Sequence, residues 1–226
     1  AAQLRVAQGL PANVIPMPLW HTASLGIDVW LTALAHGASQ IWVLATDEEA
    51  PQYADGVQAQ MQQVQTLLEG LGYAAPGQQV LHWLQANHVS ELDTELQRLS
   101  TAAQRSPLRL PPATFDVTPQ KRDTLNLVLN HLVEHAPALK TSTPPEAVVL
   151  PEEGALWGSI AVNRDACTLC MSCVSACPAG ALLDSQQAPQ LRFIEKNCVQ
   201  CGLCVKTCPE KAMERVPRLL LTPQRT

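Results

Sequence analysis

Eight cysteines carry most of the chemistry available to this chain of 226 residues, and all eight lie between Cys167 and Cys208. They form two runs with the same spacing, C-x2-C-x2-C-x3-C-P, and each cysteine recurs 31 residues later. The first run is Cys167, Cys170, Cys173 and Cys177, and the second is Cys198, Cys201, Cys204 and Cys208. Disulfides would be the usual explanation for an even cysteine count in a secreted chain. A duplicated pattern with this spacing is instead typical of iron–sulfur ligands.

The spacing also distinguishes a cluster from a single metal ion. A tetrahedral zinc site would need only two C-x2-C pairs, which would leave one cysteine of each run unused. Three cysteines two residues apart on a wrapping loop can direct their sulfurs at three corners of one cubane. Pro178 and Pro209 follow the fourth cysteines and predict a helical turn whose N-terminal amides face the anionic cluster. The pattern therefore favours iron–sulfur clusters, with zinc and disulfides as the alternatives.

The segment over 159–221 closely resembles the bacterial-type ferredoxin with two [4Fe–4S] clusters, and neither run departs from that family's pattern. In the family, the fourth cysteine of each run ligates the other cluster. The resemblance implies the following ligands: Cys167, Cys170, Cys173 and Cys208 for cluster 1, and Cys177, Cys198, Cys201 and Cys204 for cluster 2. It also implies an α+β dicluster fold, in which we expect a strand over 191–194 to pair with one over 159–162.

The residues before the cysteines predict a different domain. Apolar runs predict strands over 13–19, 40–46 and 80–84, and helical periodicity predicts helices over 24–36, 55–69, 90–103 and 119–135, the last with Thr118 as its N-cap. Strands that alternate with helices indicate an α/β domain, here a small parallel sheet with flanking helices over 1–136. The proline-rich residues 137–158 are predicted to be a linker, and 159–226 the ferredoxin domain.

Function in α/β domains gathers at the carboxyl ends of parallel strands, where this sequence offers few reactive groups. Asp47, Glu48 and Glu49 could act as general bases or bind a cation, but a solvated acidic loop is the simpler interpretation. His21 is a possible ligand or acid–base group, although a packed or surface histidine is the more ordinary interpretation. No glycine-rich phosphate loop is present, so no nucleotide is inferred.

Two further sets of residues in this domain have ordinary explanations. His131 and His135 are four apart on one helix face and could hold a metal, but no third ligand is in view. Four tryptophans lie on or beside elements that we expect to be buried, and we assign them to the core: Trp20, Trp30, Trp42 and Trp83. The domain therefore has no recognisable catalytic constellation.

Residues 12–100 resemble, more weakly, the iron–sulfur delta subunit of hydrogenases linked to heterodisulfide reductase. The resemblance is carried by NVIPMPL, by GASQIWVLATDEEAPQY and by the helix ending LLEGLGY. With Tyr53 aligned, Thr46 and Pro51 occupy the positions of that family's ligand cysteines, so we expect the domain to bind no cluster and to serve in docking. The whole chain also resembles the C-terminal part of long multi-cluster ferredoxin-like proteins that accompany formate dehydrogenase components.

Composition and charge narrow the function classes. A net charge of −5 and an aromatic content of 4% argue against nucleic acid as a partner, and no apolar stretch is long enough to span a membrane. Residues 1–158 carry a net charge of −8, whereas 159–226 carry +3. Two oxidised clusters of about −2 each, thiolates included, would bring the second segment to about −1. The basic residues of 159–226 would therefore largely offset the negative charge of the clusters.

These observations predict an electron-transfer module or subunit of a larger oxidoreductase, of the formate dehydrogenase or hydrogenase type. The expected partner is a redox protein or another domain of a longer chain. Thiolate ligands predict a reducing compartment, most simply the cytoplasm. Two alternatives remain open: a structural or redox-sensing iron–sulfur protein, and an enzyme in the α/β domain served by the clusters. Residues 1–8 resemble the tail of an amphipathic helix, so we also expect the chain to be part of a longer polypeptide.

Overall fold

The computed structural model describes residues 10–105, 108 and 110–221, so the helix tail expected at 1–8 lies outside the described residues. The chain divides into two compact units, residues 1–142 (unit 1) and 143–226 (unit 2). Unit 1 contains the parallel strands and the long helices, whereas all eight cysteines belong to unit 2. No described helix combines the length and apolarity that a membrane crossing requires.

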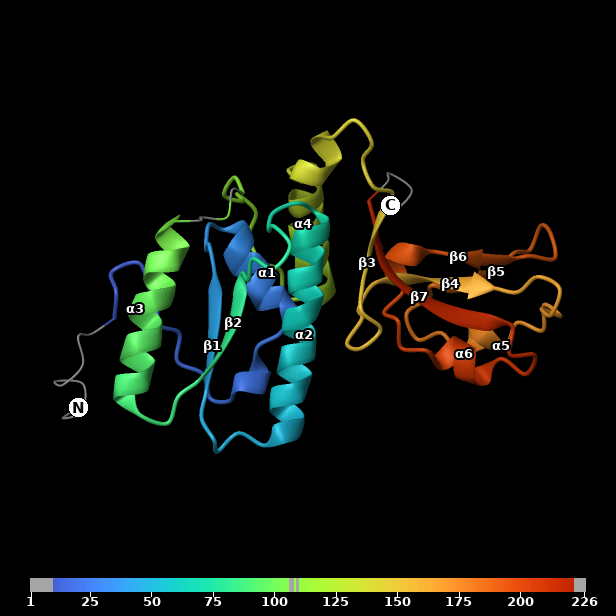
Figure 1. The fold of residues 1–226 in the computed structure, drawn as a ribbon. Coiled ribbons are helices and arrows are strands. Elements are labelled where there is room, and N and C mark those ends of the chain that lie inside the picture. The colour runs from blue at the N-terminus through green and yellow to red at the C-terminus, as the bar shows by residue number, and fades with distance from the viewer. Residues whose placement is uncertain (1–9, 106–107, 109, 222–226) are drawn as a thin grey trace. The chain divides into compact units, whose positions relative to one another are not determined.

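Unit 1 is built on a two-stranded parallel sheet. Strands β1 (Ile41–Ala45) and β2 (Leu81–Gln85) pair in register from Ile41 with Leu81 to Ala45 with Gln85. Helix α2 (Pro51–Gly70) connects them, because parallel neighbours need a long crossover. Helix α3 (Val89–Arg105) lies on one side of the sheet, and α1 (Ile27–Ala35), α2 and α4 (Lys121–Glu134) lie on the other (Figure 1).

Apolar side chains on both sides of this sheet explain why the helices pack there. On the α3 side, Leu96 and Leu99 contact Leu84 of β2 and the partly buried Trp42 of β1. The core residues of α1, α2 and α4 recur at helical spacing and are almost fully buried: Trp30, Leu31, Leu34, Val64, Leu67, Leu68, Val128, Leu129 and Leu132. Helix α2 begins four residues before the predicted start because Pro51 occupies its first turn, where a missing N–H has no cost.

The strand predicted over 13–19 is wrong, because residues 14–19 are irregular in the structure. Pro16 and Pro18 cannot donate ladder hydrogen bonds, and two of them in seven residues prevent regular pairing. The assignment of Trp20 to the core is wrong as well, because Trp20 is fully exposed. Trp30 is 1% exposed and belongs to the core.

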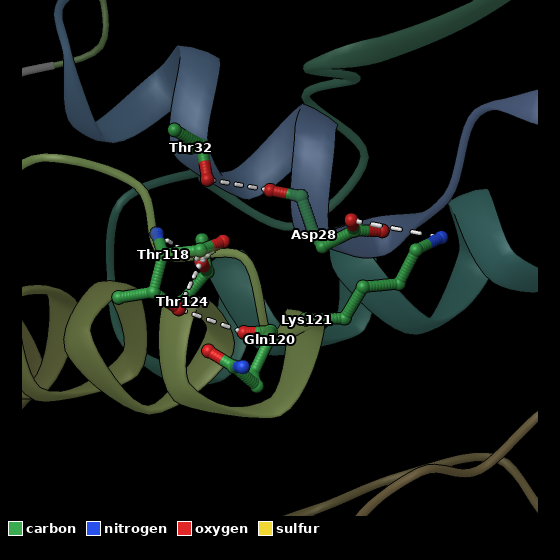
Figure 2. Close-up of polar contacts among 6 residues, drawn as sticks. All are labelled: Asp28, Thr32, Thr118, Gln120, Lys121 and Thr124. Carbon is green, nitrogen blue, oxygen red and sulfur yellow. Dashed lines mark hydrogen bonds and ion pairs between the residues drawn. The ribbon is translucent and has the colours of Figure 1, made fainter.

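Helix α4 begins at Lys121, two residues after the predicted start, and Thr118 is not its N-cap. Figure 2 shows the reason: Thr118 donates its hydroxyl to Gln120 O at 2.9 Å, and its backbone N–H goes to Thr124 Oγ1, also at 2.9 Å. These local bonds form a turn before the helix. Lys121 Nζ lies 3.8 Å from Asp28 Oδ2 of α1, so the start of α4 also contacts the first turn of α1.

The described part of unit 2 consists of antiparallel strands of three to eight residues and two short α-helices. Strands β3 (Ala147–Val149), β7 (Met213–Leu220) and β4 (Gly158–Val162) form one sheet in that order, and β5 (Leu182–Asp184) pairs with β6 (Leu191–Phe193). Helices α5 (Ser172–Ser175) and α6 (Leu203–Thr207) lie inside the two cysteine runs, between these strands (Figure 1). The pairing of 191–194 with 159–162 expected from sequence is wrong, because β6 pairs with β5 and β4 with β7.

The segment over 137–158 is structured in two places. A single 3-10 turn covers Pro137–Lys140, and β3 pairs with β7, Ala147 opposite Leu220 and Val149 opposite Arg218. The prolines explain the linker prediction, but the apolar run that follows them at 147–150 supplies an edge strand, with Val148 and Leu150 buried. The end of this segment therefore belongs to unit 2.

Candidate iron–sulfur site

Strand pairing in unit 2 brings each cysteine run against the end of the other. Strand β4 precedes the first run and β7 follows the second, and their pairing sets Val162 opposite Met213. Strand β5 follows the first run and β6 precedes the second, and their pairing sets Leu182 opposite Phe193. Asn163 N donates to Ala212 O, and Ile194 N donates to Ala181 O, both at 2.8 Å. The start of each run is thus held beside the end of the other.

The core of unit 2 repeats the 31-residue period of the sequence. Its members come in pairs with that offset: Ile160 and Leu191, Val162 and Phe193, Cys173 and Cys204, Val174 and Val205, Cys177 and Cys208, Leu182 and Met213. An arrangement in which equivalent residues pack together has approximate two-fold symmetry. Two equivalent sites are the expected consequence.

Two hollows of nearly equal size contain the cysteines. The first, of about 370 Å³ and partly open to solvent, is lined by Cys167, Cys170, Cys173 and Cys208. The second, of about 350 Å³, is lined by Cys177, Cys198, Cys201 and Cys204. We call them site 1 and site 2. The structure therefore groups three cysteines of each run with the fourth cysteine of the other run.

The backbone between the cysteines adopts an unusual conformation. Leu169 and Met171 in the first run have positive φ, as do Gln200 and Gly202 at the equivalent positions of the second run. Left-handed residues in a loop can turn neighbouring N–H groups to one side, where they form a concavity suited to anions. Such strain in non-glycine residues is characteristic of functional loops. The C-x2-C spacing places these residues between cysteines that line the hollows.

The structure does not support the helical turn expected after the fourth cysteines. Residues 178–180 and 209–210 form turns, and the two short helices lie within the runs instead. Backbone donors still face the sulfurs, since Ala181 N donates to Cys177 Sγ at 3.3 Å and Ala212 N to Cys208 Sγ at 3.4 Å. Proline at the first turn position fixes φ, and a turn suffices to direct the amide four residues after each cysteine.

The two sites differ in exposure. Cys198 and Cys204 of site 2 are each 8% exposed, and burial raises the pKa of both thiols. Burial also raises the pKa of Cys173 in site 1, whereas a hydrogen bond from Ser172 lowers the pKa of the exposed Cys170. For Cys177, burial alone would raise the pKa, but N–H donors of residues 179–182 lower it overall. Ligation of iron would require the thiolate form, which burial disfavours at site 2, and the positive charge of bound iron would offset that effect.

The geometry favours clusters over single ions. All eight cysteines are thiols rather than disulfides. A tetrahedral zinc site with bonds of about 2.3 Å would hold its sulfurs only about 3.8 Å apart. Within the described parts of the chain, no three histidine, cysteine or acidic side chains converge closely enough to hold one metal ion. Four cysteines around a hollow, without convergence on one point, suit a cubane that places its iron atoms between them.

The candidate residues of unit 1 are only partly brought together. His21 Nε2 lies 3.5 Å from Glu49 Oε2, and the His21 ring packs edge-on against Tyr53 at 4.9 Å. His21 Nδ1 accepts the Ala23 N–H, which makes this histidine a local cap of a 3-10 turn. Asp47 and Glu48 are exposed, as the solvated-loop interpretation expects.

The other candidates of unit 1 have structural roles. His131 Nε2 contacts Pro111 O at 2.8 Å, and His135 Nδ1 contacts His131 O at 3.0 Å, so a ring nitrogen of each is occupied by a carbonyl. Thr46 follows β1 and accepts the Glu48 N–H, and Pro51 is the first residue of α2. Neither residue offers a sulfur to iron.

The sequence interpretation missed Gln200. Gln200 is 3% exposed, and its side-chain Nε2 donates to Cys198 Sγ at 3.4 Å. The signal is present in the sequence, since a polar residue stands between Cys198 and Cys201 where the first run has Leu169.

Comparisons with known proteins agree with this geometry. A family model described as a 4Fe-4S dicluster domain matches residues 166–213. A ferredoxin-type protein NapH of Haemophilus influenzae is 32% identical over 57 residues, which are 24% of this chain and 20% of that protein. One of the subunits of an ion-translocating oxidoreductase complex of Methanosarcina acetivorans is 37% identical over 54 residues, again 24% of this chain and 20% of the relative. Both matches thus span about one fifth of the relative's length.

A third relative matches over most of its own length. The delta subunit of an NADH-dependent phenylglyoxylate dehydrogenase of Aromatoleum evansii is 33% identical over 70 residues, which are 30% of this chain and 73% of that subunit. All three relatives are ferredoxin-type proteins or subunits of oxidoreductases by their names. With eight cysteines grouped around two hollows, the chain contains an iron–sulfur electron-transfer domain for two [4Fe–4S] clusters, and it belongs to the family of dicluster ferredoxin-type iron–sulfur proteins.

Proposed function

We propose that the chain carries electrons through its two clusters as a module or subunit of a larger oxidoreductase complex, of the formate dehydrogenase or hydrogenase type. The observation that carries the proposal is the grouping of three cysteines from one run with one from the other around each hollow. With ligands shared in this way, the two clusters would lie close together beside the small core that contains Cys173, Cys177, Cys204 and Cys208. A closely spaced pair suits electron transport.

We propose these ligands for the two sites: Cys167, Cys170, Cys173 and Cys208 for site 1, and Cys177, Cys198, Cys201 and Cys204 for site 2. When bound, each cluster supplies reversible one-electron chemistry. The chain's own residues hold it, donate N–H groups to the sulfurs, and control the access of water. Cys170 and Cys201 are exposed, so each site has one ligand facing solvent at which a redox partner can approach.

We propose residues 1–136 as a cofactor-free docking domain, 137–158 as the connection, whose strand β3 pairs with β7 of unit 2, and 159–226 as the ferredoxin domain. The support in unit 1 is chemical, since Thr46 and Pro51 cannot ligate iron. The partner is a redox protein or other domains of a longer chain, without nucleic acid, in the reducing environment of the cytoplasm. Fully exposed Trp20 with the nearby Met17, 65% exposed, offers apolar area for such docking.

A redox titration of anaerobically purified protein, followed by visible absorbance and EPR, tests the proposal. We expect about eight iron atoms and eight sulfides per chain and reversible reduction of both clusters at low potential. Reduction that is irreversible and releases iron would contradict electron transfer and favour a structural or sensing role. Stoichiometric zinc without acid-labile sulfide would contradict the clusters themselves.

A further inference from the structure

Gln200 is a buried amide that faces a ligand cysteine of site 2. Its Nε2 donates to Cys198 Sγ at 3.4 Å and to Ser159 O at 3.0 Å. Its Oε1 is buried without a hydrogen-bond partner among the described residues. The reverse orientation of the amide would set its oxygen against a sulfur and a carbonyl, both acceptors. Both N–H groups of the amide are therefore committed, one of them to the sulfur.

The surroundings of Gln200 hold this amide in place. A Cβ at Gly158 of β4 would lie 2.7 Å from Gln200 Nε2 and Cδ, so only glycine leaves room for the amide there. The backbone of Gln200 is in the left-handed region, with φ of 53°. Its carbonyl accepts from Arg215 Nη1 of β7 at 3.1 Å. Two strands thus fix both the main chain and the side chain of this residue.

The 31-residue repeat provides an internal comparison. Leu169 occupies the equivalent position in the first run, is 38% exposed and has no N–H to donate from its side chain. Site 1 instead has the Ser172 hydroxyl 3.4 Å from Cys170 Sγ, and the equivalent of Ser172 in the second run is Leu203. The backbone donors at Ala181 and Ala212 are the same in both sites. The sites therefore differ in their side-chain donors and in burial.

We propose that Gln200 sets the reduction potential of the site 2 cluster, by donating its N–H to the Cys198 sulfur and raising that potential. Reduction adds one electron from an external low-potential donor and changes the charge at the site from about −2 to about −3. Burial of Cys198 and Cys204 disfavours the added charge, whereas an N–H donor to a ligand sulfur stabilises it. Gln200 thus offsets the effect of burial on the potential, so that site 2 stays reducible in the same range as the more exposed site 1. The inference rests on the ligands proposed above.

EPR-monitored redox titration of Gln200→Met tests this role, because methionine keeps the length of the side chain and removes the donor. We expect one of the two midpoints to shift to lower potential while the other stays. Gln200→Asn, whose amide is one methylene shorter, should shift the same midpoint in the same direction. Leu169→Met is the matched control and should leave both midpoints in place. Ser172→Ala should lower the other midpoint, because its hydroxyl serves site 1.

The outcomes separate this inference from the proposed function. Unchanged midpoints in both Gln200 variants would overturn it, and so would a shift of the same midpoint by Gln200→Met and Ser172→Ala. Loss of iron and sulfide from both Gln200 variants, with full content in the controls, would make Gln200 structural and would equally overturn it. Absence of iron and sulfide from the unsubstituted protein would instead contradict the proposed function.

Discussion

The ion pair between Arg218 of β7 and Glu195 offers a quantitative test of how unit 2 presents site 2. Arg218 Nε and Nη2 donate to the two carboxylate oxygens of Glu195 at 3.1 and 2.7 Å, a bidentate arrangement. The side chains are 31% and 14% exposed, and hydrogen bonding to Glu195 raises the pKa of the Arg218 guanidinium. Glu195 begins the 3-10 turn Glu195–Asn197 that ends at Cys198, whose N–H donates to Glu195 O at 3.0 Å. Arg218 therefore clamps the turn that leads into site 2.

The contribution of this ion pair to the stability of unit 2 follows from its geometry and exposure. Hydrogen bonds to charged groups contribute about 1.5–3 kcal/mol, whereas exposed ion pairs contribute about 0.2–1 kcal/mol. Partial exposure of Arg218 places the whole clamp near the lower end of the first range, at about 1.5 kcal/mol. We expect Arg218→Ala to lower the free energy of unfolding of unit 2 by about that amount, close to a tenfold change in the unfolding equilibrium. Arg98→Ala removes a far more exposed pair with Glu95, 64% and 44% exposed, and should cost under about 0.5 kcal/mol.

The assay is the rate at which an iron chelator bleaches the visible absorbance under anaerobic conditions. If local opening of the turn precedes iron loss, Arg218→Ala should accelerate the bleaching of half of the absorbance by about tenfold. Arg218→Lys keeps the positive charge but loses the bidentate hydrogen bond, so its bleaching rate should lie between those of the wild type and Arg218→Ala. Equal bleaching in Arg218→Ala and Arg98→Ala would refute the reasoning, as would acceleration of the whole absorbance.

Two predictions concern the stability of unit 1, measured by urea unfolding across a range of pH. Tyr73→Phe should lower the free energy of unfolding of unit 1 by about 1 kcal/mol, because the buried phenol donates a hydrogen bond to Leu132 O at 2.7 Å. Burial raises the pKa of Tyr73, so wild-type stability should hold below pH of about 10 and fall above it, where the unfolded phenol ionises. Tyr73→Phe should flatten that fall, and an unchanged slope would contradict the assignment. Burial, and then the charge of Arg98, lower the pKa of His82, so stability should fall below pH of about 6.5 as the unfolded imidazole takes up a proton. His82→Gln should reduce this loss of stability at acid pH. An unchanged dependence of stability on pH below about 6.5 would contradict the role given to His82.

The iron–sulfur sites were predictable from sequence because their information is local. Each run fixes its cysteines within eleven residues, and the duplication reveals that there are two sites. The pairing of strands was not predictable in the same way. Strands β4, β5 and β6 have only three to five residues and carry little register information, so the pairing of β6 with β5 and of β4 with the longer β7 depends on the symmetric core. That pairing places Cys177 beside the cysteines of the second run and Cys208 beside those of the first run.

In unit 1, local patterns conflicted with backbone requirements. The apolar residues of 13–19 have a strand-like composition, but Pro16 and Pro18 prevent a ladder. Trp20 is apolar and yet fully exposed, which no pattern of neighbouring residues reveals. The position of Gln200 against Gly158 likewise depends on a contact between a loop residue and strand β4, which are 42 residues apart in the chain. Contacts of this kind become visible only in the fold.

Iron content of double variants tests the shared-ligand assignment most directly. Cys177→Ala with Cys201→Ala removes two proposed ligands of site 2, so the protein should keep one cluster and about four iron atoms per chain. Cys177→Ala with Cys173→Ala removes one ligand from each site and should leave almost no iron. Sites built from separate runs would reverse these results, with about four iron atoms in the second variant and almost none in the first. That reversal would contradict the account.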